Sequence, residues 1–212
     1  MKILLKFQLH SPWHVGTGMG SGLGADALTY KSARRLPEIP GRSVKGLLRD
    51  AFRVAEAAGA IEAGITESYF GSAPGSRTEE NSMAARQEMD RYDTDSGQFR
   101  IDSARLGAGD AEQDQWQTWA ATEEAAPLVA QMTEIISSTA LEDGVARKGA
   151  LRTVEVALPM TLYGEVSSDS VDESQFAQNL QIVLPLLRQV GKTRHRGFGR
   201  CTVTIAETEV KV

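Results

Sequence analysis

The chain has 212 residues and a net charge of −5 at pH 7, with 24% charged and 41% hydrophobic residues. The length fits one domain with insertions, and the composition is that of an ordinary globular protein. No apolar run is long enough to span a bilayer and the first residues do not resemble a signal peptide, so we expect a cytoplasmic protein without a membrane partner. Cys201 is the only cysteine, which excludes an internal disulfide and a cysteine-cluster zinc site and favours a reducing compartment.

The charged residues are distributed unevenly along the chain. Residues 31–53 hold seven Lys and Arg against two Asp and Glu, and residues 188–200 hold five Lys and Arg with no acidic residue. Residues 54–143 hold 18 acidic and five basic residues. Because binding of a polyanion depends on the local field, such a chain can bind RNA on one face while its acidic part faces solvent or a protein neighbour.

The N-terminal part predicts a strand, a glycine-rich loop and a helix. Residues 2–10 alternate apolar and polar side chains as a half-buried strand does. The loop at residues 16–26 lacks the Gly-Lys-Ser/Thr that closes a Walker motif, and no clear crossover unit follows to support a dinucleotide fingerprint. Residues 43–58 carry one apolar stripe of helical spacing, with Ser43 as the expected N-cap and Gly59 as the expected C-cap.

The middle of the chain is less regular. Residues 67–97 are polar and without periodicity, which favours a long surface insertion, and residues 99–106 predict a short strand. Residues 115–129 predict a helix that is broken near Pro127. Residues 133–151 are expected to form an irregular excursion.

The C-terminal part returns to clear elements. Residues 151–166 predict one long strand or a hairpin, with Pro159 at a bend or an edge position. Residues 172–190 predict a second helix with an apolar face, and Pro185 inside it predicts a kink or a local loss of hydrogen bonding.

A basic glycine loop at residues 191–199 then leads into a last strand at residues 200–207. The order along the chain is strand, helix, strands, helix, strand, with insertions. This is the βαββαβ order of the ferredoxin-like, RRM-like fold in the α+β class. An antiparallel sheet packed on two helices also suits RNA, since its open face or its loops can follow a single strand.

Two basic segments are candidate phosphate-binding sites. A helix N-terminus offers free backbone N–H groups and a partial positive charge, and several cations surround the first turns of the helix that begins at Ser43. The basic glycine loop gathers a second group of cations. The expected RNA contacts in these two segments are Arg42, Ser43, Lys45, Arg49, Lys192, Arg194 and Arg196.

Three segments resemble motifs of one protein family. LPEIPGRSVKGLLRDAF, residues 36–52, resembles the IPG segment of the RAMP superfamily, the repeat-associated proteins of CRISPR effector complexes. GKTRHRGFGRCTVTI, residues 191–205, resembles its C-terminal glycine-rich loop, and ESYFGS followed later by FRIDSARL resembles a segment of type III backbone subunits. The motifs occur in the family's order and span nearly the whole chain. Within the superfamily, the sequence is most similar to the small backbone subunit of type III interference complexes.

The resemblance implies a domain organisation and a set of partners. It implies one RAMP domain over residues 1–212, with a ferredoxin-like palm at 1–66 and 151–212, an insertion at about 67–114 and a thumb region at about 115–150. It also implies that the chain binds CRISPR RNA, target RNA, other CRISPR effector subunits and copies of itself. The thumb of this family interrupts the guide–target duplex at regular intervals.

The resemblance also implies roles for single residues. Arg147 and Lys148 lie near the thumb and are expected to meet RNA phosphates. Asp26 follows the first glycine-rich loop, where type III backbone subunits carry an aspartate, which implies metal-dependent cleavage of target RNA. RNA carries its own nucleophile, the 2′-hydroxyl, and a loop carboxylate can hold Mg²⁺ together with the substrate phosphate because that ion keeps most of its waters. Asp26 is therefore the expected catalytic residue and Mg²⁺ ligand.

Two alternatives remain open. Aspartate is common in the turns of glycine-rich loops, and an Asp26 with that role alone would leave a structural subunit that binds RNA without cutting it. The histidines can instead supply a metal-independent acid–base pair, as in ribonucleases that process CRISPR RNA. Their spacing is not that of a zinc site, and His14 and His195 are better placed as RNA contacts.

Overall fold

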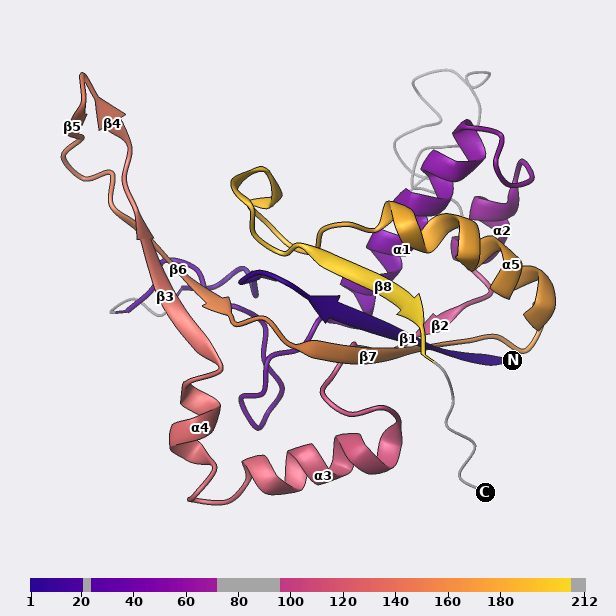
Figure 1. Cartoon of the computed structure of the whole chain (residues 1–212), viewed down its shortest axis with the longest axis horizontal. Helices are drawn as coiled ribbons and strands as arrows, with labels where there is room; N and C mark the ends of the chain where they lie inside the picture. Colours follow the sequence, from indigo (N-terminus) through magenta and orange to yellow (C-terminus); the bar gives the residue numbers. More distant parts are fainter. Residues whose placement is uncertain (21–23, 72–95, 207–212) are drawn as a thin grey trace, which may run out of the picture.

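The computed structural model describes residues 1–20, 24–71 and 96–206, except the side chain of His195. Most of the predicted polar insertion at residues 67–97 lies outside the described residues, as does the end of the last predicted strand. In the described part, a central antiparallel sheet carries helices on both faces, and a long two-stranded extension projects from one end (Figure 1).

The central sheet has the strand order β2–β7–β1–β8, and each neighbouring pair is antiparallel. The strands are β1 (Lys2–Leu9), β2 (Arg100–Ile101), β7 (Thr161–Ser167) and β8 (Cys201–Ile205). The alternation predicted for the first strand is confirmed, since Ile3, Leu5, Phe7 and Leu9 are all buried. The predicted strand at residues 99–106 is shorter than expected, and its later part contributes only single bridges, at Ala104 and Arg105.

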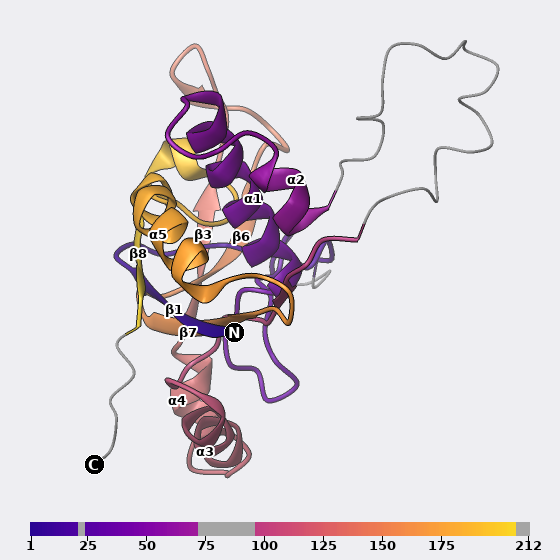
Figure 2. The ribbon, with the colours of Figure 1, turned by 90° about the vertical axis from the view of Figure 1, so that its right-hand side faces the viewer.

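Two helices cover one face of this sheet, as Figures 1 and 2 both show. They are α1 (Gly41–Ala57) and α5 (Glu173–Val183). Between them and the sheet lies a cluster of aromatic rings, in which Phe176 stacks on Phe52 at 6.2 Å and approaches Phe99 at 4.4 Å between centroids. The core of the described chain therefore sits on this side of the sheet.

The two ends of α1 differ in how they compare with the predicted caps. Ser43 is not the cap of α1, because the helix begins at Gly41 with Pro40 as N-cap and no side-chain cap bond. The helix begins two residues before Ser43, at the point where the backbone of Gly41 packs against β2. Only glycine fits there, because a Cβ at this position would lie 2.3 Å from the Ile101 carbonyl oxygen. Gly59 follows the C-cap with φ +70°, as expected for the left-handed residue that ends a helix.

The predicted second helix ends at its proline. α5 stops at Val183, and a single 3₁₀ turn, η1 (Leu184–Leu186), contains Pro185. Proline lacks the N–H of the helical ladder and clashes with the preceding turn, which explains the change at this point. The predicted buried face is confirmed, because Phe176, Leu180 and Val183 are fully buried.

The first residues of the predicted surface insertion at residues 67–97 lie in the core. Residues 65–70 form α2 (Ile65–Phe70), whose Tyr69 and Phe70 are buried in the aromatic cluster. The absence of periodicity in the sequence was misleading here, because a helix of six residues is too short to show one. α2 packs against α1.

Two further helices lie on the opposite face of the sheet (Figures 1 and 2). They are α3 (Asp110–Ala120) and α4 (Ala126–Ala130). The predicted helix at residues 115–129 is thus two helices, with the break before Pro127 at the first turn of α4. Trp116 and Trp119 of α3 pack edge to face at 5.4 Å beside a small apolar cluster of their own.

The expectation of an irregular excursion at residues 133–151 is wrong. β3 (Thr133–Ser138) pairs antiparallel with β6 (Arg152–Ala157), and β4 (Leu141–Glu142) and β5 (Val145–Ala146) form a hairpin at the tip. We call residues 133–157 the arm. The arm projects away from the central sheet (Figure 1). The segment at residues 151–166, predicted as one long strand or a hairpin, is instead two strands that do not pair with each other, β6 in the arm and β7 in the central sheet, with Pro159 between them.

The fold is therefore mixed α and β with antiparallel sheets, as the sequence predicts. No helix in the described part of the chain is both long and apolar enough to cross a membrane.

The aromatic cluster should dominate the stability of this fold. Phe176→Ala removes a fully buried ring that contacts Phe52, Tyr69 and Phe99. We expect the free energy of unfolding to fall by about 3–5 kcal/mol, the usual cost of removing a buried aromatic ring. Urea denaturation followed by circular dichroism measures this, with the half-exposed apolar residue Ile182 of the same helix changed to Ala as control. Equal losses for both variants would contradict the assignment of the core.

Candidate nucleic-acid interface

The segment that carries Asp26 runs along the arm. The backbone N–H of Asp26 donates to the carbonyl of Thr153 at 2.8 Å, and the N–H of Glu155 donates to the carbonyl of Ala27 at 2.9 Å. Ala27 and Val154 form a parallel bridge. Asp26 is therefore attached to β6, which pairs with β3 in the arm, rather than to the central sheet.

The carboxylate of Asp26 is exposed and held by one residue. Its Oδ2 atom accepts hydrogen bonds from the backbone N of Thr153 at 2.7 Å and from the Thr153 hydroxyl at 3.1 Å. These two bonds, from the backbone first and the side chain second, lower the pKa of Asp26 below its ordinary value. The group is thus ionised at neutral pH.

Asp26 fits Mg²⁺ better than it fits a metal that needs several protein ligands. Among the described residues, no group of three or more His, Cys, Asp or Glu side chains is placed to hold a metal ion. Mg²⁺ keeps several waters and is commonly bound by one or two carboxylates together with substrate phosphates. A single exposed, ionised carboxylate would meet that requirement if a substrate phosphate were bound beside it.

Glu155 holds the next residues of the same segment. Its carboxylate, with a side chain 12% exposed, accepts from the backbone N of Thr29 at 3.2 Å and from the Lys31 ammonium at 2.5 Å. It also accepts from the hydroxyl of Thr133 on β3 at 3.2 Å. One half-buried carboxylate therefore joins β3 and β6 of the arm to the segment that follows Asp26.

His14, expected to contact RNA, is buried. Only 3% of it is exposed, and its Nδ1 atom lies 2.7 Å from the carbonyl oxygen of Glu155. Its own carbonyl accepts from the backbone N of Lys192 at 2.9 Å. Gly191 makes this close approach possible, because it has φ +84° and a Cβ there would lie 2.2 Å from the His14 carbonyl oxygen. His14 thus packs beneath the basic glycine loop and accepts a backbone hydrogen bond from it, instead of facing solvent.

The basic glycine loop presents its cations to solvent. A 3₁₀ turn, η2 (Arg194–Arg196), follows Thr193, which has a left-handed φ of 63°. Lys192, Arg194 and Arg196 are exposed, which leaves them accessible for the predicted phosphate contacts. The side chain of His195 lies outside the described part of the structure.

The structure brings the arm and this loop together around a basic cleft of about 410 Å³. We call it the basic cleft. Arg147, Lys148 and Arg152 from the arm line it together with Arg196 from the loop. Sequence reasoning named three of these residues but missed Arg152, which stands at the first position of β6 and had no motif to mark it. Four cations around one cleft concentrate positive potential there, which is the potential that attracts a polyanion.

The helix α1 contributes less to this surface than its sequence predicts. Arg42 is exposed, whereas Ser43 and Lys45 are half-buried. Burial, followed by the nearby charge of Arg49, lowers the pKa of Lys45. None of these side chains is among the residues that line the basic cleft.

Arg49 is a structural residue in this fold. Its guanidinium donates to the carbonyl oxygens of Phe70 and, at 3.2 Å, of Gly71. Phe70 is the last residue of α2 and Gly71 is its C-cap, so neither carbonyl has a partner within the helix. Arg49 therefore caps α2, and its expected role as an RNA contact is not supported by its position.

This position leads to a prediction. Arg49→Met keeps the aliphatic stem but leaves the carbonyls of Phe70 and Gly71 without their donor, so the free energy of unfolding should fall by about 1–3 kcal/mol. The affinity of the folded protein for RNA should stay within about twofold, because the guanidinium is bound to backbone carbonyls and does not line the basic cleft. Thermal denaturation and filter binding measure the two quantities. Arg53→Met, at an exposed position of the same helix, is the control. If Arg49→Met lost RNA affinity without losing stability, Arg49 would be an RNA contact and not a cap.

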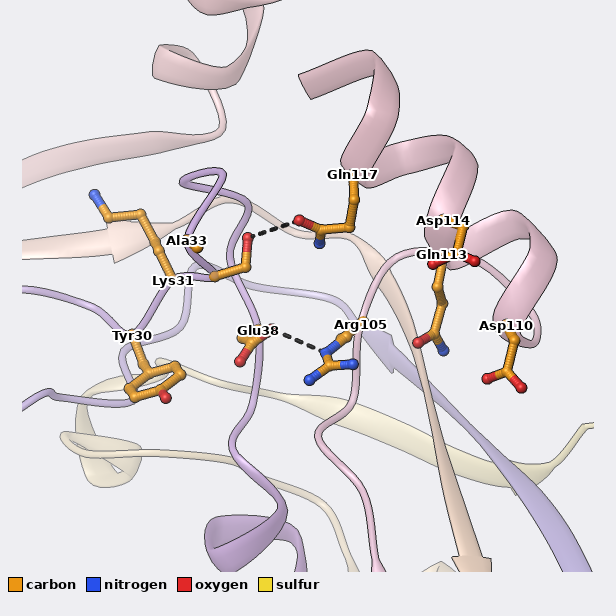
Figure 3. Close-up of a pocket in the computed structure, with 10 residues that line it drawn as sticks. Tyr30, Lys31, Ala33, Glu38, Arg105, Asp110, Gln113, Asp114 and Gln117 are labelled. Atoms are coloured by element: carbon orange, nitrogen blue, oxygen red, sulfur yellow. Dashed lines mark hydrogen bonds and ion pairs between the residues drawn. The ribbon is translucent and has the colours of Figure 1, made fainter. Parts of the chain in front are cut away.

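A second pocket, of about 610 Å³, lies between α3 and the chain that precedes α1 (Figure 3). On one side Glu38 is buried and pairs with Arg105 at 3.1 Å, and on the other α3 presents Asp110 and Asp114. Glu38 and Arg105 lie in two of the motif segments, but the sequence did not indicate that they line a common pocket. Its lining holds three carboxylates against two cations, Lys31 and Arg105, so it lacks the uniform positive charge of the basic cleft.

Comparison with known proteins agrees with this architecture. Solved structures with the same fold include a chain from the cryo-EM structure of type III-B Cmr-beta in the apo state, with a TM-score of 0.67, 10% identity and 98% of both chains covered. Another is a chain of type III-B Cmr-beta bound to cognate target RNA, with a TM-score of 0.61, 9% identity and 96% of both chains covered. No curated protein matches the sequence. The sequence profile of the RAMP superfamily matches residues 6–202, nearly the whole chain, and the protein therefore belongs to the RAMP superfamily.

Proposed function

We propose that this RAMP protein is a CRISPR RNA-binding backbone subunit of a type III RNA-guided complex, and that it cleaves the paired target RNA in a Mg²⁺-dependent reaction. Family membership and the fold shared with chains of type III-B Cmr-beta support the first part. The second structure with this fold is described as bound to cognate target RNA, which supports RNA as the partner proposed for this chain.

The topology supports a ferredoxin-like palm. β1, α1, β2, β7, α5 and β8 follow one another as a βαββαβ unit, and the sheet order β2–β7–β1–β8 places the first strand between the third and the fourth. α3, α4 and the arm are inserted between β2 and β7. We propose that the palm comprises β1, α1, β2, β7, α5 and β8, within residues 1–66, 100–101 and 158–206, and that the thumb lies within residues 115–157, because β6 pairs with β3 in the arm and not with the central sheet.

The observation that carries the proposed RNA binding is the basic cleft. Cations from the arm and from the basic glycine loop converge there, although the two segments are far apart in the chain. Phosphate contacts supply most of the sequence-independent affinity for RNA, which suits a subunit that must accept any guide. Exposed Lys192 and Arg194 of the same loop would extend this surface beyond the cleft, and exposed Arg42 on α1 stays a separate proposed RNA contact.

Asp26 is the residue proposed for cleavage. When bound, Mg²⁺ would neutralise charge that develops on the scissile phosphate. Asp26 would hold the ion from the protein side, because its carboxylate is exposed and its pKa is lowered. The cations of the basic cleft would hold the RNA backbone beside it and so keep the 2′-oxygen in position to attack.

A non-cleaving structural subunit is the second candidate. The observation in its favour is that Asp26 already accepts two hydrogen bonds from Thr153. For a carboxylate held in this way, attaching its loop to the arm could be its whole role. Cleavage by the assembled complex distinguishes the two candidates. The metal-independent ribonuclease is not favoured, because His14 is buried beneath the basic glycine loop.

The proposal can be tested through the RNA that the protein carries. We expect the protein purified with its CRISPR array and neighbouring subunits to contain short RNA of defined length, visible in the ratio of absorbance at 260 and 280 nm and on a denaturing gel. The same preparation should contain several copies of the chain or related subunits. Protein that stays free of RNA, monomeric and indifferent to added guide RNA would overturn the proposal.

A further inference from the structure

We infer that Thr153 is the positioning residue for Asp26, so that the arm, and not the central sheet, determines where this carboxylate stands. The inference rests on the proposed function, because it assigns Asp26 a role in holding Mg²⁺ beside target RNA. It adds a residue for which no sequence motif gave a sign.

The contacts between the two residues are reciprocal. The Thr153 hydroxyl donates its one hydrogen to Oδ2 of Asp26 at 3.1 Å and accepts from the backbone N–H of Asp26 at 3.1 Å. The backbone of Thr153 adds a donor to Oδ2 at 2.7 Å and an acceptor for the Asp26 N–H at 2.8 Å. Both the chain and the carboxylate of Asp26 are therefore oriented by a single residue 127 positions away.

The position of Thr153 connects this orientation to the arm. Thr153 pairs with Ser137 of β3 inside the arm's ladder. Arg152, the preceding residue, lines the basic cleft. Adjacent residues of β6 thus hold the proposed Mg²⁺ ligand and one of the phosphate contacts. A shift of the arm on RNA would carry both groups together.

Groups that orient a metal ligand by hydrogen bonds commonly change metal affinity or activity by about 10–100-fold when they are lost. Thr153→Val keeps the shape and the backbone donor but removes the hydroxyl. We expect the Mg²⁺ concentration for half-maximal cleavage to rise about tenfold, while guide affinity and the melting temperature stay near those of the wild type. Thr153→Ser retains the hydroxyl and should restore the Mg²⁺ dependence, which a merely structural role for the methyl-bearing side chain would not do.

A second measurement does not depend on cleavage. The guide-loaded complex is bound to a target RNA that carries 2′-deoxyribose at the scissile position, and Fe²⁺ with peroxide and ascorbate then generates hydroxyl radicals wherever the ion binds. We expect a local cut in the RNA for the wild type and for Thr153→Ser. For Thr153→Val the same cut should require about ten times more Fe²⁺.

The outcomes separate this inference from the proposed function. If Asp26→Asn cleaves like the wild type, the proposed cleavage role of Asp26 fails regardless of Thr153. If Asp26→Asn is inactive while Thr153→Val matches the wild type in Mg²⁺ dependence and in the Fe²⁺ cut, the proposed function stands and the positioning role of Thr153 is overturned. Failure of Thr153→Ser to restore the Mg²⁺ dependence would also overturn it.

Discussion

Asp26→Asn should reduce target-RNA cleavage by the assembled, guide-loaded complex at least about 100-fold, the scale expected when several kcal/mol of metal-dependent stabilisation is lost. The amide oxygen can still accept the hydrogen bonds of Thr153, so the loop should keep its place along β6. Only the negative charge that would hold Mg²⁺ is removed. Affinity for guide RNA should remain within about twofold of the wild type, because phosphate binding depends on cations.

The control for this experiment is Asp50→Asn, which neutralises an exposed carboxylate on α1 and should leave cleavage unchanged. Cleavage is followed with end-labelled target RNA over a range of Mg²⁺ concentrations, and with EDTA in place of Mg²⁺. Full activity of the Asp26→Asn complex would remove Asp26 from the reaction and favour the structural subunit. Wild-type cleavage that persists in EDTA would contradict the dependence on metal.

The second large effect concerns the basic cleft. Arg147→Gln combined with Arg196→Gln removes one cation from the arm and one from the basic glycine loop. For single-stranded RNA the slope of log affinity against log salt changes by about 0.7 per phosphate contact, so the double variant should lower the slope by about 1.4. At physiological salt this corresponds to roughly a tenfold loss of guide affinity.

A matched control comes from the other end of the sheet. Lys2→Gln also removes one exposed cation, but Lys2 pairs with Glu165 at 3.0 Å near the N-terminus, far from the arm (Figure 1). Its salt slope should equal that of the wild type. Titrations of labelled guide RNA at several salt concentrations measure both quantities. An unchanged slope in the double variant would show that the cleft holds no phosphate.

The elements that the sequence predicts well are those whose signal is local. β1 shows its alternation within eight residues, and Pro185 marks the end of α5 because its ring cannot continue the helix. The prediction of Ser43 as N-cap is wrong because the identity of the cap depends on where α1 begins. That entry point is set by the contact of Gly41 with β2, which no local pattern reports.

In the candidate site too, features with a local signal could be predicted, whereas contacts between distant segments could not. The cations of the basic glycine loop could be identified from composition, and they are exposed as predicted. The burial of His14 and the use of Arg49 as a cap for α2 could not, because each depends on carbonyl groups supplied by a distant segment. A polar side chain looks the same in sequence whether its partner is water, RNA or a backbone carbonyl.

By itself, the sequence determined the family, the main strands and helices, and the separation of basic from acidic segments, because motifs, periodicity and charge are properties of neighbouring residues. The tertiary structure alone decided which groups meet. It formed the arm from β3 and β6, attached Asp26 to Thr153, and placed Arg152 beside Arg196. These contacts depend on long-range strand pairing and on the burial of polar groups only where partners exist, and neither is encoded in any short segment.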